Sequence, residues 1–599
     1  MREFEMCDKC KAEYENPFDR RFHAEPIACP DCGPQVTFYD NEKNLISERH
    51  EAIVKAAQFI REGKIVAVKG LGGFQLLADA SNEKAIKTLR ERKHREEKPL
   101  AMMFPSLENV KDFCEVNSEE EKLLCSAHAP IVLLRKKENN FIAKSIAPEN
   151  NYYGVMLPYT PLHKILLEVL DTPIAATSGN ISDEPICIDN DEAFEKLGGI
   201  ADYFLVHNRK IVRQVDDSVA RIVKGKPFMI RRARGFAPYP VITDSEVPPA
   251  IAAGGHLKNT VAISSGKNIF ISQHIGDLDT KEAFGAFKKI IHDFQNLYAV
   301  KPGTVISDLH PDYVSTKFAE KLGLNHFQVQ HHYAHMLSCI AENKIEGEVL
   351  GICWDGTGFG TDGNIWGGEF LKVNEDKFER FAHLKYFPLP GGEKAINEIW
   401  RTGVSLLSSV QSKEEVKNYY SKHDADTILN LIEKKINSPL TSSMGRLFDG
   451  ISSIINLTQY SSYEGQAAMQ LENIVDVNSE ERYEFELIKS QKNNFDIEWR
   501  NVIKEVFFDL KNGILKETIS SKFHNALVDL ILKVCNLSGM QQIALSGGCF
   551  QNKFLLEKSI DMLTNNGYKV YWQSEIPIND GGISLGQMMY YNFLNKNRK

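Results

Sequence analysis

The sequence lacks long hydrophobic runs, an excess of positive charge and a cysteine framework. No apolar stretch approaches the ~18 residues that a membrane-spanning helix needs, and the first residues are polar, unlike a signal peptide. We therefore expect a cytoplasmic protein without a membrane partner. The net charge of −9 argues against a nucleic-acid partner, because phosphate binding favours a basic surface. Eleven cysteines in 599 residues are too few for a disulfide scaffold.

The length exceeds what a single hydrophobic core supports, so several domains of roughly 100–200 residues are expected. Helical periodicity over 47–62 is followed by the apolar strand pattern KIVAVK at 64–69, and this alternation continues along the chain. It predicts a multidomain α/β protein. The segment TDSEVPP at 243–249 is typical of a linker. The predicted organisation is a small module at 1–40, an α/β domain at 41–242 and a second α/β unit at 250–599.

Four cysteines crowd the first 32 residues in the pattern CxxC–x18–CxxC, namely Cys7, Cys10, Cys29 and Cys32. Each CxxC turn brings two thiolates to one metal, and two turns complete the tetrahedron that Zn²⁺ prefers. Four redox or merely structural cysteines are the less favoured alternative. The pattern predicts a structural zinc knuckle, in which the metal supplies the folding energy that a 40-residue module lacks.

The strand at 64–69 ends at Lys69 and enters a glycine-rich loop, where backbone N–H groups can approach a phosphate. Basic side chains and the polar turn TSGN at 177–180 follow. Solvated helix or strand faces are the alternative reading of the basic clusters. Together these groups predict a cavity for a triphosphate and a small anion, lined by Lys69, Gly72, Gly73, Lys93, Arg95, Lys98, Ser178, Asn180, Arg231 and Arg232.

The KGLGGF loop, the KHREEKPL segment and the TSGN turn resemble the YrdC-like family. Members of that family condense a carbamate-type acid with ATP, supplied with Mg²⁺, to give an acyl-adenylate and pyrophosphate. The resemblance implies that Lys69, Lys93, Arg95 and Lys98 hold phosphate or carbamate, with Lys69 and Arg95 catalytic. It also implies that Ser178 and Asn180 orient the nucleotide.

A second constellation begins in the run HHYAH. His331 and His335 are four residues apart, so on a helix both imidazoles lie on one face. Asp355 follows a predicted strand at 349–354, and Asp580 lies near the C-terminus. Two imidazoles and two carboxylates suit iron or zinc better than magnesium. The four residues therefore predict a second metal site, against the alternative of capping histidines and turn aspartates. The intervening His332 is expected to be a packing residue or to support the metal ligands without binding the ion itself.

Three glycine turns, at 255–260, 355–360 and 546–548, resemble the nucleotide site of the actin/hexokinase-like (ASKHA) fold. The segments SGGCFQN at 546–552 and EGQAA at 464–468 resemble the TsaD-type carbamoyl-transfer family. This resemblance implies two subdomains and a nucleotide site formed by Lys258, Asn259, Gly356, Thr357, Gly358, Asp449, Glu464, Gly547, Gly548 and Asn552. Cys549 admits a catalytic-thiol interpretation, but no partner base is evident and packing is favoured.

The order zinc knuckle, YrdC-like domain, TsaD-like domain resembles the HypF family of hydrogenase maturation proteins over essentially the whole chain. The segments DRRFHAEP and CPDCGP look like the second zinc module of that family. The family ordinarily begins with an acylphosphatase-like domain and a first zinc module, which are missing here. We therefore expect a trimmed or short natural form, without the step that hydrolyses carbamoyl phosphate to carbamate.

The resemblance implies a relay. Carbamate, obtained from carbamoyl phosphate, would be activated with ATP as carbamoyl-adenylate. The carbamoyl group, polarised by a metal held by His331 and His335, would then pass to the C-terminal cysteine of HypE. The alternatives are an enzyme forming threonylcarbamoyladenosine in tRNA and a non-catalytic zinc scaffold. The negative charge and the knuckle weigh against the first, and the glycine loops weigh against the second.

Overall fold

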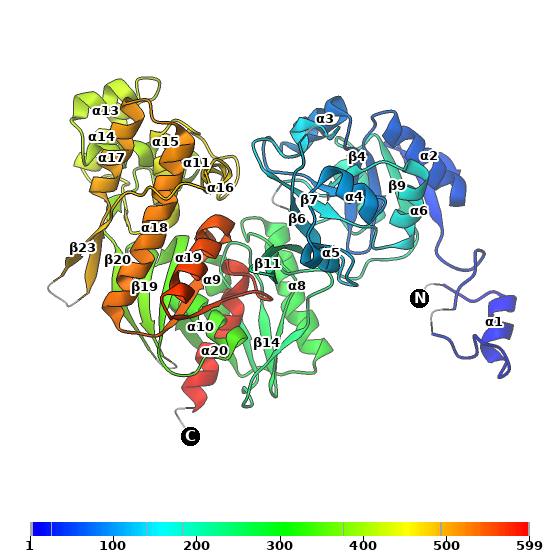
Figure 1. Cartoon of the computed structure of the whole chain (residues 1–599). Helices are drawn as coiled ribbons and strands as arrows, with labels where there is room; N and C mark the ends of the chain where they lie inside the picture. Colours follow the sequence, from blue (N-terminus) through cyan, green and yellow to red (C-terminus); the bar gives the residue numbers. More distant parts are fainter. Residues whose placement is uncertain are drawn as a thin grey trace. The chain divides into compact units, whose positions relative to one another are not determined.

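A computed structural model describes residues 4–25, 27–138, 141–182, 184–374, 377–490 and 494–596. Pro26 of the DRRFHAEP segment lies outside these residues. The chain divides into two compact units (Figure 1). The first comprises Met1–Pro148 and Tyr152–Asp216, and the second comprises Glu149–Asn151 and Asp217–Lys599. Within the described part of the chain, no helix combines the length and apolarity required to cross a membrane.

The N-terminal segment of the first unit has very little core of its own. It forms the short helix α1 (Asp8–Glu15), and its buried apolar residues are Cys10 and Ile27, whereas Phe18 is 98% exposed. Residues 36–40, expected in the knuckle, instead form strand β1 (Val36–Asp40), which pairs with β9 (Tyr203–His207). Apolar contacts therefore anchor only the end of this segment, because β1 joins the sheet that follows.

The rest of the first unit is a mixed sheet with helices. Its strand order is β6-β7-β5-β8-β4-β3-β9-β1-β2. Helix α2 (Arg49–Arg61) buries the apolar face that the sequence predicts, including Ile53 and Ile60. The remaining elements are β2 (Leu45–Glu48), β3 (Val66–Lys69), β4 (Phe74–Asp79), β5 (Ala101–Met103), β6 (Ile131–Arg135), β7 (Tyr152–Met156), β8 (Ile174–Ser178), α3 (Glu83–Lys93), α4 (Leu107–Phe113), α5 (Ser118–Leu124), η1 (Lys144–Ile146), α6 (Pro161–Leu170) and α7 (Asn190–Leu197).

The second unit begins before the expected linker. The hairpin of β10 (Val219–Val223) and β11 (Lys226–Arg231) belongs to it, because Val223 and Phe228 pack into its core. Strand β12 (Pro240–Ile242), expected at the end of the first domain, pairs with β15 (Asn268–Ile271) of this unit. A strand pattern shows that side chains will be buried, but not in which core.

Two sheets form the second unit, as expected for an ASKHA-like pair of subdomains. The first has the order β12-β15-β14-β13-β16-β17. Its remaining strands and its helices are β13 (Ala250–Ala252), β14 (Ala262–Ser265), β16 (Thr304–Asp308), β17 (Asn325–Val329), α8 (Lys281–Leu297) and α9 (Val314–Glu320). Parallel pairing of β13 with β16 and of β16 with β17 brings the ends of these strands to one edge.

The second sheet has the order β23-β24-β20-β19-β18-β25-β26, with β21 and β22 beside β19. Its strands are β18 (Val349–Phe359), β19 (Ile365–Val373), β20 (Phe378–Leu384), β21 (Phe387–Pro388), β22 (Leu440–Thr441), β23 (Glu486–Lys489), β24 (Phe495–Glu498), β25 (Gln542–Ser546) and β26 (Lys569–Trp572). The long helix α18 (Lys516–Ser538) runs beside this sheet (Figure 1). The other helices are α11 (Lys394–Asn397), α12 (Trp400–Ser408), α13 (Lys413–Tyr419), α14 (Ala425–Glu433), α15 (Met444–Ile454), α16 (Gln466–Asn473), α17 (Arg500–Lys511), η2 (Gly548–Gln551), α19 (Lys553–Asn565) and η3 (Asp580–Gly582).

Strand β18 continues beyond Trp354, where the sequence predicts a glycine turn. Its pairing with β19 is irregular between Trp354 and Gly358. The residues between them carry no regular ladder partners, so the backbone there can present Asp355 to its surroundings. The expectation of a turn directly after Trp354 is thus wrong, because the hairpin reverses only beyond Phe359.

Helices α10 (His331–Asn343) and α20 (Ile583–Lys596) pack against each other with unusually close backbones. A Cβ atom at Gly586 would lie 1.8 Å from the carbonyl oxygen of Ala334, which is far inside van der Waals contact. Glycine is therefore required at this crossing. The contact fixes the turn of α10 that carries His335 against the C-terminal helix.

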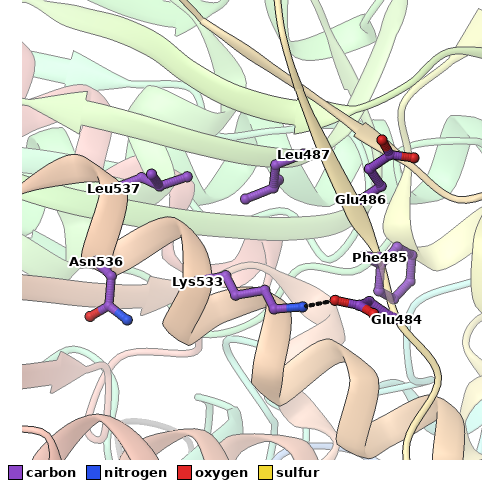
Figure 2. A pocket seen from close by; sticks show the side chains of 7 residues that line it. All are labelled: Glu484, Phe485, Glu486, Leu487, Lys533, Asn536 and Leu537. Atoms are coloured by element: carbon purple, nitrogen blue, oxygen red, sulfur yellow. Dashed lines mark hydrogen bonds and ion pairs between the residues drawn. The ribbon is translucent and has the colours of Figure 1, made fainter.

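A surface pocket of about 420 Å³ lies between α18 and the segment leading into β23 (Figure 2). Lys533 is neutralised there by Glu484 at 2.8 Å and by Asp529 at 3.0 Å. The lining residues are Glu484, Phe485, Glu486, Leu487, Lys533, Asn536 and Leu537. None of them belongs to the predicted sites.

Candidate functional site

The four N-terminal cysteines converge on one point. The Sγ–Sγ distances are 3.7 Å for Cys7–Cys29, 3.6 Å for Cys29–Cys32 and 3.6 Å for Cys32–Cys10. A tetrahedral ion about 2.3 Å from each sulfur needs sulfurs about 3.8 Å apart. Backbone N–H groups at Cys7 and Cys29 lower the pKa of Cys32 to about 6, whereas burial raises the pKa of Cys10 to about 12. The cluster therefore fits a structural zinc ion.

We expect Cys7→Ser or Cys29→Ser to release about one zinc per chain and to loosen the segment before β1. The segment has almost no core, so the metal carries its folding energy, about 10–16 kcal/mol for such sites. Zinc is measured by elemental analysis after dialysis, and loosening by limited proteolysis. The buried Cys114, remote in sequence from the cluster, gives the matched control Cys114→Ser. Full retention of zinc in both knuckle variants would contradict the assignment.

The ends of β3, β4 and β8 meet at one edge of the first unit's sheet. Lys69 pairs with Phe74, and Gln75 pairs with Ser178, so the glycine loop lies beside the TSGN turn. The Lys69 Nζ donates to Asn190 Oδ1 at 2.7 Å and to the His207 carbonyl at 3.3 Å. Burial lowers the pKa of Lys69, so a bound anion would favour its charged form.

Lys93 and Arg95 also reach this edge. The Nζ of Lys93 donates to the carbonyl oxygens of Ser178 and Asn180 at 2.7 and 2.8 Å, and to Asn180 Oδ1 at 2.8 Å. Arg95 donates to Thr177 Oγ1 at 3.3 Å. Burial, assisted by the positive charge of Arg95, lowers the pKa of Lys93 to about 7. The structure thus gathers several predicted anion-binding groups around the TSGN turn.

For other predicted residues of this site, the structure shows packing contacts, solvent exposure or a place in the second unit. A Cβ atom would lie 2.2 Å from Val215 at Gly72 and 2.1 Å from Ile186 at Gly73, so both glycines are required by packing. The Lys98 side chain is exposed. Arg231 and Arg232 belong to the second unit, where the Arg232 guanidinium binds the carbonyl oxygens of Ile271, Phe236 and Tyr239. A structural role is therefore evident for Arg232.

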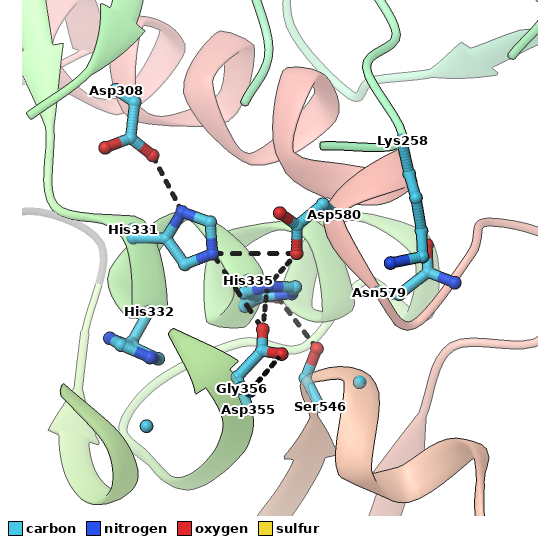
Figure 3. A network of polar contacts seen from close by, with 12 residues as sticks. Lys258, Asp308, His331, His332, His335, Asp355, Gly356, Ser546, Asn579 and Asp580 are labelled. Atoms are coloured by element: carbon cyan, nitrogen blue, oxygen red, sulfur yellow. Dashed lines mark hydrogen bonds and ion pairs between the residues drawn. The ribbon is translucent and has the colours of Figure 1, made fainter. Parts of the chain in front are cut away.

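The second unit holds a buried cluster of two histidines and two aspartates (Figure 3). His335 Nε2 lies 3.0 Å from Asp355 Oδ2 and 3.6 Å from Asp580 Oδ1. His331 Nε2 lies 3.8 and 3.7 Å from the same oxygens. The histidines come from α10, Asp355 from the irregular part of β18 and Asp580 from the start of η3. Three segments distant in sequence therefore converge, as predicted.

This cluster fits a metal ion. Its ligand atoms all lie within 4.8 Å of one another, and an ion about 2.0–2.2 Å from each would need them about 3.3–3.6 Å apart. His331 Nε2, His335 Nε2 and Asp355 Oδ2 are buried without a hydrogen-bond partner. Burial lowers the pKa of His331, yet Asp308 and Asp580 raise it well above its usual value. Such concentrated charge is compensated most simply by a bound cation.

Ser443, which the sequence did not single out, holds the backbone at Asp355 in place. Ser443 Oγ donates to the carbonyl oxygens of Asp355 and Gly356, both at 2.8 Å. The adjacent Ser442 donates to the buried Glu369 at 2.6 Å. These two serines could not be identified from the sequence, because an isolated serine pair has no diagnostic spacing.

Two of the predicted nucleotide residues of the second unit, Lys258 and Gly548, approach the same cluster. Lys258 forms an ion pair with Glu464, and burial raises the pKa of Asp449, beside Arg446, to about 6. A Cβ atom at Gly548 would lie 3.0 Å from Asp355 Oδ1, so the SGG turn directly faces the carboxylate of Asp355. Thr357 is half-buried.

Two predicted residues of this group have clear structural functions. Asn259 is fully buried and donates to the carbonyl oxygens of Ala253 and Gly255 at 2.9 and 2.6 Å. Asn552 caps α19 by accepting the N–H of Leu555, and it donates to His524 at 2.9 Å. Both side chains therefore shape loops, and nucleotide contact stays a prediction for them.

His332 and Cys549 behave as packing residues. His332 points away from the two aspartates, and its Nδ1 accepts a hydrogen bond from Gln330 at 3.1 Å (Figure 3). Burial lowers the pKa of His332 to about 3, so the ring is neutral. Burial, with the negative charge of Asp355, raises the pKa of Cys549 well above its usual value. A thiolate nucleophile at Cys549 is therefore disfavoured.

Family models match nearly the whole chain. A model described as HypF finger matches residues 6–39, and one described as Telomere recombination, covering Sua5, YciO and YrdC proteins, matches 58–233. The HypF Kae1-like domain matches 245–342. The second subdomain of the Kae1-like carbamoyltransferase domain matches 351–587.

Relatives extend this similarity over the full length. The chain is 43% identical to a carbamoyltransferase HypF from Synechocystis sp., covering 97% of this chain and 85% of that protein. A crystal structure of full-length HypF in a phosphate- and nucleotide-bound form superposes with a TM-score of 0.94 at 45% identity, covering 99% of this chain and 78% of that one. The HypF of T. kodakarensis gives a TM-score of 0.92 at 35% identity, covering 100% and 80%. Similarity to a threonylcarbamoyl-AMP synthase of Pyrococcus abyssi covers only 22% of this chain and 39% of that protein.

Proposed function

This chain belongs to the HypF family of carbamoyltransferases, and we propose that it activates carbamate with ATP and transfers the carbamoyl group to the C-terminal cysteine of HypE. One observation carries the proposal. A single chain combines a cation-rich sheet edge in its first unit with a buried His₂Asp₂ cluster in its second. The nucleotide-bound relative supports a nucleotide substrate.

Activation is assigned to the first unit. A carbamate oxygen attacks the α-phosphorus of ATP, an O–P bond forms, and the bond to pyrophosphate breaks. Carbamate is resonance-stabilised and negatively charged, so it becomes an electrophile only as a mixed anhydride. Lys69, Lys93 and Arg95 would stabilise the charge that develops on the phosphates, while Mg²⁺ arrives with the nucleotide.

Transfer is assigned to the second unit. The acceptor thiolate attacks the carbamoyl carbon, a C–S bond forms, and the C–O bond to AMP breaks. The adenylate would lie beside Lys258 and the backbone of Gly547 and Gly548, next to Asp355. The buried walls around His331 and His335 would exclude water, which otherwise hydrolyses such an anhydride.

The four residues His331, His335, Asp355 and Asp580 would hold the metal of this site. Their orphaned, buried nitrogen and oxygen atoms fit iron or zinc. A bound ion would supply Lewis-acid polarisation of the carbamoyl oxygen. The chain's own part is to orient the ligands.

The proposal predicts that the chain, with ATP, Mg²⁺ and ¹⁴C-bicarbonate plus ammonium as the source of carbamate, adds one carbamoyl group to HypE. Intact-mass spectrometry counts the carbamoyl groups added to HypE. Mass spectrometry of the C-terminal peptide then shows whether the single group lies there. A HypE variant whose C-terminal cysteine is serine is the acceptor control. Parallel reactions with carbamoyl phosphate test whether this chain also uses that donor.

Two controls sharpen the outcome. Replacing ATP by a non-cleavable α,β-methylene analogue should stop labelling, because pyrophosphate can no longer leave. Transfer RNA with threonine replaces HypE in a third reaction. Label in tRNA but not in HypE, or labelling of HypE with the analogue, would overturn the proposed function.

A further inference from the structure

Asp308 lies directly behind the metal-binding cluster. It is the last residue of β16 and is fully buried. Its Oδ2 atom is 2.8 Å from Nδ1 of His331, on the side of the ring opposite Asp355 and Asp580 (Figure 3). The short contact joins a carboxylate to the nitrogen of His331 that does not face the cluster.

The carboxylate of Asp308 is held rigidly. Its Oδ1 accepts the backbone N–H of His310 at 2.9 Å. Its backbone carbonyl accepts hydroxyl hydrogen bonds from Thr316 at 3.2 Å and from Ser307 at 3.1 Å. Strand β16 pairs with strands on both sides, which fixes the backbone as well. The carboxylate is thus aimed at His331 by the fold, independently of any ligand.

The hydrogen bond decides which nitrogen of His331 is available. An imidazole binds a cation through an unprotonated nitrogen. With Nδ1–H donating to Asp308, the lone pair of Nε2 faces Asp355 and Asp580, 3.8 and 3.7 Å away. The opposite tautomer would direct an N–H at the ion position and leave the Asp308 oxygen without its donor.

We propose that Asp308 is a positioning residue that holds the ring and the tautomer of His331 for metal binding. This inference rests on the metal centre of the proposed function. Carboxylates behind a histidine ligand orient the ring and raise its basicity, and their loss typically weakens metal binding by about 10–100-fold.

The two histidines of the cluster differ in whether a carboxylate holds their Nδ1 atom. Nδ1 of His335 is buried, and no described residue gives it a hydrogen bond. Among the described residues, no carboxylate therefore orients His335 from behind the ring, and its polar contacts are those of Nε2 with Asp355 and Asp580. Asp308 acts on His331 specifically, and its replacement should disturb one ligand of four.

The test uses Co²⁺ as the probe on the full chain, with its zinc knuckle already loaded. Cobalt bound by thiolates shows strong charge-transfer absorption, so its absence identifies binding at the His₂Asp₂ site. Dissociation constants are compared for the parent, Asp308→Asn, Asp308→Ala and Asp312→Asn. Asp312 is the matched control because it is an exposed aspartate of the same loop, paired with Lys317 at 2.8 Å. Circular dichroism and urea unfolding of the cobalt-free proteins monitor folding.

We expect Asp308→Asn to weaken cobalt binding about 10-fold and Asp308→Ala about 100-fold. The amide oxygen of asparagine can still accept the Nδ1–H of His331, so this variant should retain part of the affinity. The ligand-field spectrum should also change in both variants, whereas Asp312→Asn should match the parent. A purely structural Asp308 would lower the urea midpoint without altering the affinity or the spectrum of the folded fraction.

Two outcomes separate this inference from its premise. If the parent binds no cobalt at this site, the proposed metal centre fails and the inference falls with it. If the parent binds cobalt and folded Asp308→Asn binds equally well, the inference alone is overturned. Should both variants fail to fold, a crystal structure of the cobalt-loaded parent decides. Binding through His331 Nε2 with Asp308 still on Nδ1 is expected, and binding through Nδ1 or directly to Asp308 overturns the inference.

Discussion

His335→Ala is expected to lose carbamoyl transfer to HypE by roughly 10³-fold or more while carbamate-dependent exchange of pyrophosphate into ATP continues. His335 has the shortest contact of the cluster, 3.0 Å to Asp355, and alanine leaves three of the four ligands. The exchange reaction is assigned to the first unit, which contains none of these residues. Single-turnover transfer and isotope exchange measure the two halves on the same preparation.

His292→Ala is the matched control for this variant. His292 is an exposed histidine on α8 of the same unit, hydrogen-bonded only to Asn296 among the described contacts. It should transfer at the parent rate. Loss of exchange together with transfer in His335→Ala would contradict the separation of the two reactions. Undiminished transfer would remove the metal cluster from the mechanism.

Lys69→Ala and Arg95→Ala should each lower pyrophosphate exchange by about 10²-fold or more, with the chain still folded. Both cations lie at the edge where β3 and β8 end and β4 begins, and both reach polar atoms on or beside the expected substrate path. Removing either leaves negative charge uncompensated as pyrophosphate departs. Exchange of labelled pyrophosphate into ATP, with and without carbamate, is the measurement.

An independent supply of the intermediate distinguishes activation from transfer. Carbamoyl-adenylate made by the parent chain and added at once should restore labelling of HypE by Lys69→Ala, since its second unit is unchanged. Lys64→Ala, at an exposed lysine just before β3, controls for the loss of a positive charge. Normal exchange in both Lys69→Ala and Arg95→Ala would place activation elsewhere.

The sequence predicted those parts of the fold and site that have a local signature. Two CxxC turns, or two histidines four residues apart on a helix, carry their geometry in their spacing. The convergence of Asp355 and Asp580 with them was predicted from the ligand chemistry of two imidazoles and two carboxylates, and the structure brings them together. The cysteine cluster and the two-subdomain fold of the second unit could likewise be predicted from the sequence.

Features that depend on long-range packing could not be predicted from the sequence. The hairpin β10–β11 reads as two ordinary strands, and only Val223 and Phe228 in the second core show where it belongs. The glycines at 72 and 73 suggested a phosphate loop, although contacts with Val215 and Ile186 already require them. Asp308 precedes His331 by many residues and follows no motif, so its contact emerges only when β16 and α10 lie together.

The arrangement of the predicted metal-binding residues along the chain has a consequence for synthesis. Roughly 250 residues separate His335 from Asp580, and a ribosome adding about 5–20 residues per second needs about 12–50 seconds to make them. For most of that interval the nascent chain holds two histidines and one aspartate of the cluster without the fourth residue and without α20. The predicted site is therefore complete only after all three segments that build it have been synthesised.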